Sequence, residues 1–131
     1  MKEIKIGTIG TAETMVTKEN TALTVGSGSL NVFSTPMMTA LMEQAACNAL
    51  EAFLENDETT VGTKLDITHD SATPEGVAIK ATAEVIEVNG REIVFTVKAE
   101  DECGVIGKGL HKRFVVFAEK FMNKTLAKHQ K

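Results

Sequence analysis

The chain has 131 residues, 43% of them hydrophobic, a composition that suits a single domain, residues 1–131, with one core. Its net charge of −4 offers no basic footprint for nucleic acid, and no apolar run approaches the roughly 18 residues of a membrane span. Because the N-terminus lacks a signal-peptide core and Cys47 and Cys103 match no metal-ligand spacing, we expect a cytoplasmic protein with reduced thiols and no metal site.

The N-terminal quarter predicts a strand, a loop and the start of a helix. Residues 3–17 are rich in Ile, Thr and Val, which favours a strand. Residues 26–34 contain two glycines and three serines, which favours a flexible loop. Thr35 then precedes Pro36, a pair typical of a helix start, with Thr35 as the capping residue and Pro36 in the first helical position.

From Pro36 to about Leu54, apolar residues recur at steps of three and four, which predicts a long helix. Further apolar residues widen the stripe, so this helix should be largely buried. The residues of the main stripe are Met38, Leu41, Met42, Ala45, Ala49 and Phe53.

The rest of the chain alternates apolar and polar residues, which predicts strands. Four consecutive strands are expected, with a two-residue hairpin turn at Asn89-Gly90, followed by a short polar helix. One apolar helix followed by antiparallel strands indicates an α+β fold whose sheet curls around the helix. The expected strands cover residues 61–70, 77–85, 93–99 and 105–117, and the helix covers residues 118–128.

Glu43 is the first candidate for chemistry, because it is the only charged residue between Glu19 and Glu51. Burying an unpaired carboxylate costs free energy, so such a residue usually has a partner or a shifted pKa. His69 shares its predicted strand face with Val61 and Leu65, and from that face it could approach Glu43 as an acid–base pair. Alternatively, His69 is a core-edge residue satisfied by a backbone carbonyl.

Two further features are ambiguous. Helix capping alone would explain Thr35, and eight residues of helix rise about 12 Å, so Thr35 cannot touch Glu43 within one straight helix. Lys108, His111 and Arg113, together with Lys112, form the densest basic cluster of the chain. This cluster suits phosphate binding, but it also suits a solvated strand edge protected by charge.

The whole pattern resembles the hotdog fold, in which a curved antiparallel sheet of about five strands wraps a long helix. Over about residues 10–118, the chain resembles a small thioesterase family that includes the fluoroacetyl-CoA thioesterases. The resemblance is carried by the segment Phe33-Ser-Thr-Pro-Met-Met-Thr-Ala-Leu-Met-Glu43, by Gly62 and by Thr68-His-Asp70.

The resemblance implies a set of functional residues. The family's catalytic Thr, Glu and His fall on Thr35, Glu43 and His69, and its glycine N–H near the thioester carbonyl falls on Gly62. Basic residues of the last strand, here Lys108, His111 and Arg113, would face the phosphates of coenzyme A. No metal or cofactor is implied beyond the coenzyme A of the substrate. Related proteins pair their sheets into homodimers, or dimers of such dimers, with active sites at the interface.

The leading hypothesis is therefore hydrolysis of a small acyl-CoA thioester. The loop Gly26-Ser-Gly-Ser29 has no aromatic residue to form a tight lid, which argues against selectivity for a fluorinated or very short acyl group. One alternative is hydration of an enoyl-CoA, although His69 and Asp70 are adjacent and so point to opposite faces of a strand. The other is an acyl-CoA binding protein without turnover.

Overall fold

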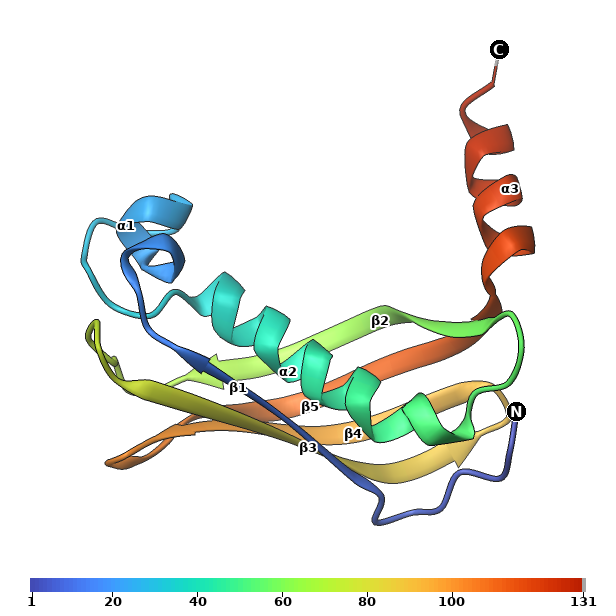
Figure 1. Cartoon of the computed structure of the whole chain (residues 1–131), viewed down its shortest axis with the longest axis horizontal. Coiled ribbons are helices and arrows are strands. Elements are labelled where there is room, and N and C mark those ends of the chain that lie inside the picture. Colours follow the sequence, from blue (N-terminus) through green and yellow to red (C-terminus); the bar gives the residue numbers. More distant parts are fainter. Residues whose placement is uncertain (131) are drawn as a thin grey trace.

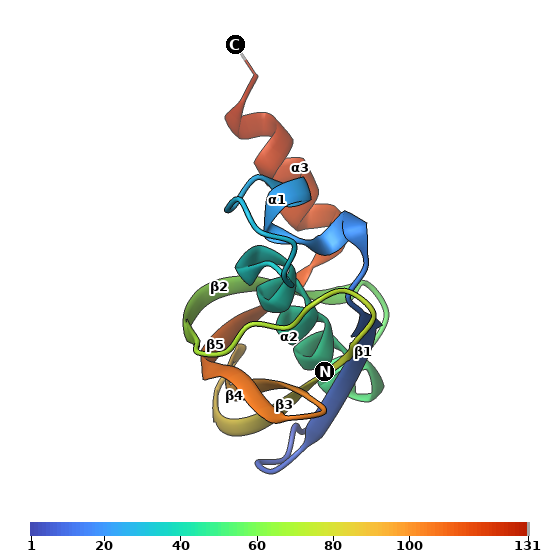
Figure 2. The same ribbon diagram turned by 90° about the vertical axis from the view of Figure 1, so that its left-hand side faces the viewer.

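A five-stranded antiparallel sheet curls around one long helix (Figure 1), which confirms the predicted α+β fold. The structure is a computed structural model and describes residues 1–130. Viewed from its end, the sheet forms a trough in which the long helix lies (Figure 2). The strands, in the order β1-β3-β4-β5-β2, are β1 (Ile9–Met15), β2 (Glu58–His69), β3 (Ala78–Asn89), β4 (Glu92–Asp101) and β5 (Gly104–Phe117).

The long helix, α2 (Thr35–Leu50), is followed by a 3₁₀ turn, Glu51–Phe53, close to the predicted end at Leu54. Before it come a 3₁₀ turn, Lys18–Asn20, and the short helix α1 (Ala22–Val25); after β5 comes α3 (Ala118–Lys128). The first strand starts later than residue 3, at Ile9. None of the described helices is long and apolar enough to cross a membrane.

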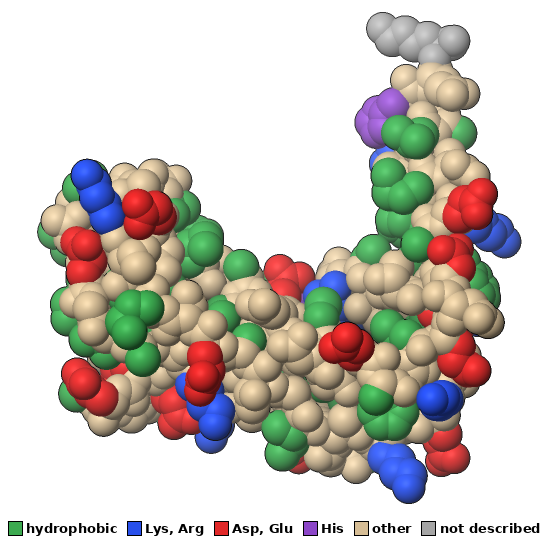
Figure 3. Space-filling view, viewed as in Figure 1, with side chains coloured by type: hydrophobic (Ala, Val, Ile, Leu, Met, Phe, Trp, Pro, Cys, Tyr) green, Lys and Arg blue, Asp and Glu red, His purple; other side chains and the backbone are tan. Residues whose placement is uncertain are grey.

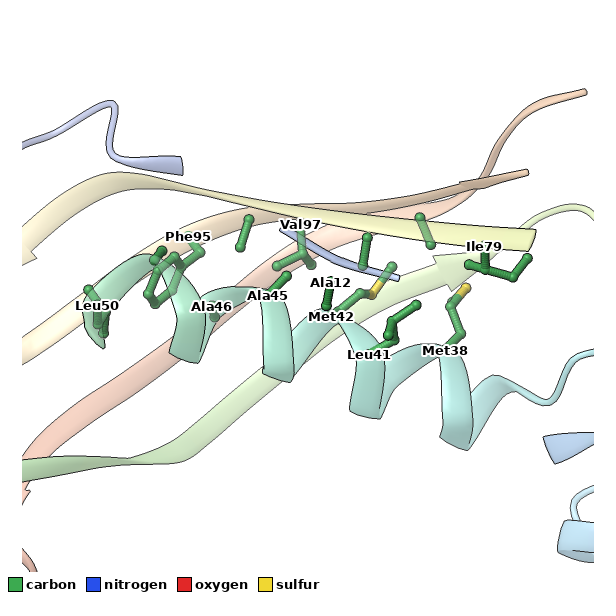
Figure 4. Packing of buried hydrophobic residues seen from close by; sticks show 14 of the residues in the cluster. Ala12, Met38, Leu41, Met42, Ala45, Ala46, Leu50, Ile79, Phe95 and Val97 are labelled. Carbon is green, nitrogen blue, oxygen red and sulfur yellow. The ribbon is translucent and has the colours of Figure 1, made fainter. Parts of the chain in front are cut away.

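The inner face of α2 packs on the sheet to form the core (Figure 4). Three alanines on this face allow a close approach to the strands. A Cβ atom at Gly10 of β1 would lie 2.2 Å from the carbonyl oxygen of Ala45 and 2.3 Å from the nitrogen of Ala49. The two backbones are therefore in direct contact at this point. The buried residues of α2 are Met38, Leu41, Met42, Ala45, Ala46, Ala49 and Leu50.

The start of α2 differs from the sequence prediction by one residue. Ser34, not Thr35, caps the helix: its backbone is extended, and its hydroxyl accepts a hydrogen bond from the Met37 N–H at 3.3 Å. Thr35 is the first helical residue and Pro36 the second. Both serine and threonine are good caps, and proline fits either of the first positions, so the local sequence allows both registers.

A β-bulge at Thr63 changes which residues of β2 face the helix. The register with β5 shifts between Gly62 and Lys64, so Gly62 lies opposite Arg113 while Leu65 lies opposite His111. The expected simple alternation, which put Val61 on the same face as His69, is therefore wrong. The extra residue turns Gly62 toward the helix and leaves His69 on that side as well.

β2 forms one edge of the sheet and pairs only with β5 among the strands of residues 1–130. The α3 helix extends away from the sheet beyond β5, and none of its residues is buried. Figure 3 shows a hollow between α3 and the lobe that contains α1.

Candidate active site

The first pair of candidate residues joins the start of α2 to the end of β2. The Thr35 hydroxyl oxygen lies 2.7 Å from Nδ1 of His69. Because Ser34 caps the helix, the Thr35 hydroxyl is available for this contact. Burial lowers the pKa of His69, which favours the neutral ring at neutral pH. Nε2 of His69 is buried and has no hydrogen-bond partner among residues 1–130.

A cavity of about 260 Å³ lies beside this pair. Its lining combines small side chains with hydroxyl groups. A larger groove of about 500 Å³ crosses the outer face of β3, β4 and β5, but it contains none of Thr35, Glu43 and His69. The smaller cavity is lined by Ala22, Ser27, Val32, Phe33, Thr35, His69, Asp70, Ser71 and Ala72.

Glu43 has a charged partner that the sequence did not reveal. Nη1 of Arg113 donates a hydrogen bond to Oε2 of Glu43 at 3.1 Å, and the Glu43 side chain is 37% exposed. Gly62 lies against the same carboxylate, since a Cβ atom there would be 2.6 Å from Oε2. The glycine thus brings the backbone of β2 next to the carboxylate, as required of an N–H donor near the reacting group.

His69 and Glu43 do not form the expected pair within one chain. His69 bonds to Thr35, and eight residues of α2 separate Thr35 from Glu43 by about 12 Å. Along β2, Gly62 and His69 are about 20 Å apart at the usual rise per residue. Each chain therefore carries two separate candidate half-sites, Thr35 with His69 and Glu43 with Gly62.

The basic residues of β5 do not form one cluster. His111 and Arg113 are 0% and 6% exposed and face α2, whereas Lys108 is exposed on the outer face of the sheet. The expectation that His111 and Arg113 face coenzyme A phosphates is therefore wrong for this chain, because both side chains are committed to interior contacts. His111 and Arg113 lie four and two residues from buried Val115, on the same face of the strand. This spacing was the sequence signal that could have indicated their burial.

Within residues 1–130 no group of three or more His, Cys, Asp or Glu side chains is arranged to hold a metal ion. Both cysteines are exposed free thiols. The candidate chemistry of the site therefore lies with the hydroxyl, imidazole, carboxylate and backbone N–H groups described above.

Comparison with known proteins shows the family to which the chain belongs. A family model described as fluoroacetyl-CoA-specific thioesterase matches residues 16–119. The fluoroacetyl-CoA thioesterase of Streptantibioticus cattleyicolor is 41% identical over 97 residues, which cover 74% of this chain and 70% of that protein.

Solved structures share this fold. A structure of a fluoroacetyl-CoA thioesterase superposes with a TM-score of 0.90 at 32% identity, covering 99% of this chain and 100% of that one. A hot-dog-like protein from Thermanaerovibrio acidaminovorans superposes with a TM-score of 0.88 at 22% identity, covering 98% and 95%, and supports the fold alone. The predicted hotdog fold is confirmed, and the chain belongs to the fluoroacetyl-CoA-specific thioesterase family.

Proposed function

We propose that this protein hydrolyses a small acyl-CoA thioester to a free carboxylic acid and coenzyme A. The observation that carries the proposal is the 2.7 Å contact between Thr35 and His69 beside a cavity, in a member of a thioesterase family. Glu43 beside the backbone of Gly62 supplies the second half of the machinery.

In this proposal Glu43 acts in one of two ways. As a general base it takes a proton from a water molecule that attacks the thioester carbonyl, or as a nucleophile it attacks that carbonyl itself and forms a transient anhydride. The Thr35 hydroxyl, oriented by His69, and the Gly62 N–H stabilise the oxyanion, and one such donor typically lowers the barrier by about 3 kcal/mol. The thiolate of coenzyme A is a good leaving group, so the reaction needs little acid assistance. The mechanism uses no metal or added cofactor.

We further propose a homodimer, alone or as a pair of dimers, because the two half-sites are separate within one chain. β2 is a 12-residue strand with one edge unpaired in the described structure, and such edges favour pairing with another chain. Antiparallel pairing of two β2 strands about a two-fold axis would bring the His69 end of one strand toward the Glu43 half-site of the other. Each active site would then use both subunits.

The substrate contacts follow from the same arrangement. The cavity beside Thr35 and His69 is proposed to hold the acyl group, and its small lining residues leave space for side chains beyond acetyl. Lys108 remains the candidate for a coenzyme A phosphate, because it is exposed and lies opposite Lys98 in the sheet register. Two adjacent ammonium groups suit an anionic ligand.

A thiol-release assay across acyl-CoAs, from acetyl to long-chain and aryl substrates, tests the proposal. Wild type should turn over at least one of them, and Glu43→Gln should lower kcat by about 10²-fold or more, because the amide can act neither as base nor as nucleophile. Absence of turnover on every acyl-CoA, or full turnover by Glu43→Gln, would contradict thioester hydrolysis. Crotonyl-CoA should show no loss of enoyl absorbance.

A further inference from the structure

We propose that α3 of one subunit packs against α1 of a second copy of this chain and so holds one wall of that copy's acyl cavity in place. The acyl cavity is the cavity of about 260 Å³ beside Thr35 and His69. This inference rests on the proposed function, in which two β2 strands pair into a homodimer and the cavity holds the acyl group. It gives a role to a helix that the proposed chemistry does not use.

The α3 helix has an apolar face that its own chain leaves exposed. Phe121, Met122 and Leu126 are 38%, 50% and 59% exposed, and their spacing places them on one side of the helix. Lys120 and Lys124 occupy the opposite side. Hydrophobic side chains of α3 face the hollow between this helix and the lobe that contains α1 (Figure 3). Because an 11-residue helix is only marginally stable in water, this face indicates a packing partner.

The base of α3 is fixed to the sheet, so the helix has a defined direction. The Ala118 N–H donates to the carbonyl oxygen of Asp57 at 2.9 Å, and the Glu119 N–H donates to the carboxylate of Asp57 at 3.0 Å. The guanidinium of Arg91 lies over the ring of Phe117, 4.7 Å from its centroid. A helix held out from the sheet in this way suits a partner of fixed geometry.

The place of α3 at the edge of the sheet indicates a second copy as this partner. Phe117, which precedes α3, pairs with Glu58, the first residue of β2. At the other end of β2, His69 lines the acyl cavity together with Ala22 of α1. In an antiparallel pair of β2 strands, the Glu58 end of one lies beside the His69 end of the other, so α3 of one copy approaches α1 of the other. In both views α1 and α3 extend past β2 in the same direction (Figures 1 and 2).

The α1 helix offers a matching apolar surface. Leu23 and Val25 are 52% and 40% exposed, whereas Ala22 of the same short helix lines the acyl cavity. The Ala22 N–H donates to the carbonyl oxygen of Val32 at 2.8 Å, which ties α1 to the segment that leads into α2. A helix packed on Leu23 and Val25 would therefore hold the cavity wall from outside and bury two exposed apolar surfaces together.

The first experiment crosslinks the two helices in a chain in which Cys47 and Cys103 are changed to serine. Leu126→Cys and Leu23→Cys chains are unfolded together, refolded and treated with a short bis-maleimide. We expect a product of twice 14.1 kDa in the mixture and about tenfold less in either variant alone, whose dimers carry thiols on one kind of helix only. Ala127→Cys, on the polar side of α3, is the control for Leu126→Cys. A dimer in which both positions crosslink equally would overturn the inference.

The second experiment measures the effect on the acyl cavity. Leu126→Glu places a charge in the proposed contact, and Ala127→Glu places the same charge on the polar side of α3 as the control. In Leu126→Glu we expect KM for the acyl-CoA to rise about tenfold and kcat to stay within about threefold, because a loosened wall binds the acyl group less tightly. Inhibition by free coenzyme A, which has no acyl group, should change less than about twofold. An unchanged KM, or an equal weakening of coenzyme A inhibition, would contradict the role of α3.

The crosslink separates failure of this inference from failure of the proposed function, because it requires no turnover. A crosslinked dimer that is inactive on every acyl-CoA would support the contact and contradict thioester hydrolysis. An active dimer without the crosslink would contradict the contact alone, and a monomer would overturn both the contact and the proposed homodimer. Binding of wild type to phosphatidylglycerol vesicles that is lost in Leu126→Glu would identify a membrane surface as the partner and overturn the inference.

Discussion

At Gly62 the absence of a side chain allows a carboxylate, a guanidinium and the backbone of β2 to meet. The bulge at Thr63 turns this glycine inward, opposite Arg113. The requirement for glycine here is spatial: any Cβ atom would enter the volume that the Glu43 carboxylate occupies.

We predict that Gly62→Ala lowers kcat by about 10²-fold while the melting temperature changes little. The added methyl group displaces the far end of the Glu43 side chain and not a packed hydrophobic residue, so the loss falls on catalysis. Thiol release and thermal unfolding measured side by side check this. Thr59→Ala, at an exposed position of the same strand, is the matched control, and wild-type kcat in Gly62→Ala would count against the role of this glycine.

Two histidines, one buried and one partly buried, predict how stability depends on pH. Burial lowers the pKa of both His69 and His111. In the unfolded chain both titrate near their ordinary value of about 6.5, so below that pH the unfolded state binds more protons than the folded state. The free energy of unfolding should therefore fall as the pH drops from about 7 to about 5.

Urea denaturation at several pH values in this range checks the prediction. His111→Gln should show a shallower dependence than wild type, because one of the two histidines with a lowered pKa has been removed. His129→Gln, which changes an exposed residue beyond α3, serves as the control. An identical slope in wild type and His111→Gln would show that His111 does not contribute.

At the level of elements, Ser34 and Thr35 have different roles at the start of α2, and this difference decides which contact the Thr35 hydroxyl makes. Ser34 performs the capping that was predicted for Thr35, and the Thr35 hydroxyl instead reaches His69 on β2. A capping role and the proposed catalytic role thus fall on two adjacent residues of similar chemistry.

Substitutions of Ser34 and Thr35 test whether the two residues have these different roles. Ser34→Ala should lower the free energy of unfolding by about 1 kcal/mol, the usual value of an N-cap. Thr35→Ala should leave stability nearly unchanged but reduce kcat, because its hydroxyl makes no cap bond. Denaturation curves and thiol-release rates of both variants check this prediction. A large loss of stability in Thr35→Ala would show that Thr35 also caps the helix.

Periodicity predicted the α2 helix and the strands well, because both patterns are local and repeat along the chain. The bulge at Thr63 has no strong local signal, and a single extra residue reversed the predicted facing of Val61. The pairing of Glu43 with Arg113 joins residues 70 positions apart, and that of Thr35 with His69 joins residues 34 apart. No local pattern encodes such contacts. Charge, strand parity and family resemblance therefore supplied the candidate residues from the sequence, and the structure supplied their partners.

At the level of the whole molecule, the two half-sites predict complementation between inactive variants. A heterodimer of His69→Ala and Glu43→Gln subunits contains one site with both groups intact, if each site uses two subunits. Statistical mixing of equal amounts should then restore about a quarter of wild-type activity, since half of the dimers are mixed.

The measurement is the thiol-release rate after the two variants are unfolded together and refolded, compared with the same variants refolded separately. Sedimentation should show a mass about twice the 14.1 kDa of one chain. If the mixture stays as inactive as its components while the protein is dimeric, each chain completes its own site.

The direct backbone contact between Gly10 and α2 limits how this enzyme can be redesigned. Any side chain at position 10 would push against Ala45 and Ala49 and shift the helix that carries both Thr35 and Glu43. In a mutant library aimed at new acyl groups, position 10 should remain glycine in every active clone, although it lies outside the cavity. Exposed loop positions 29–31, which do not line the cavity, should instead accept many side chains.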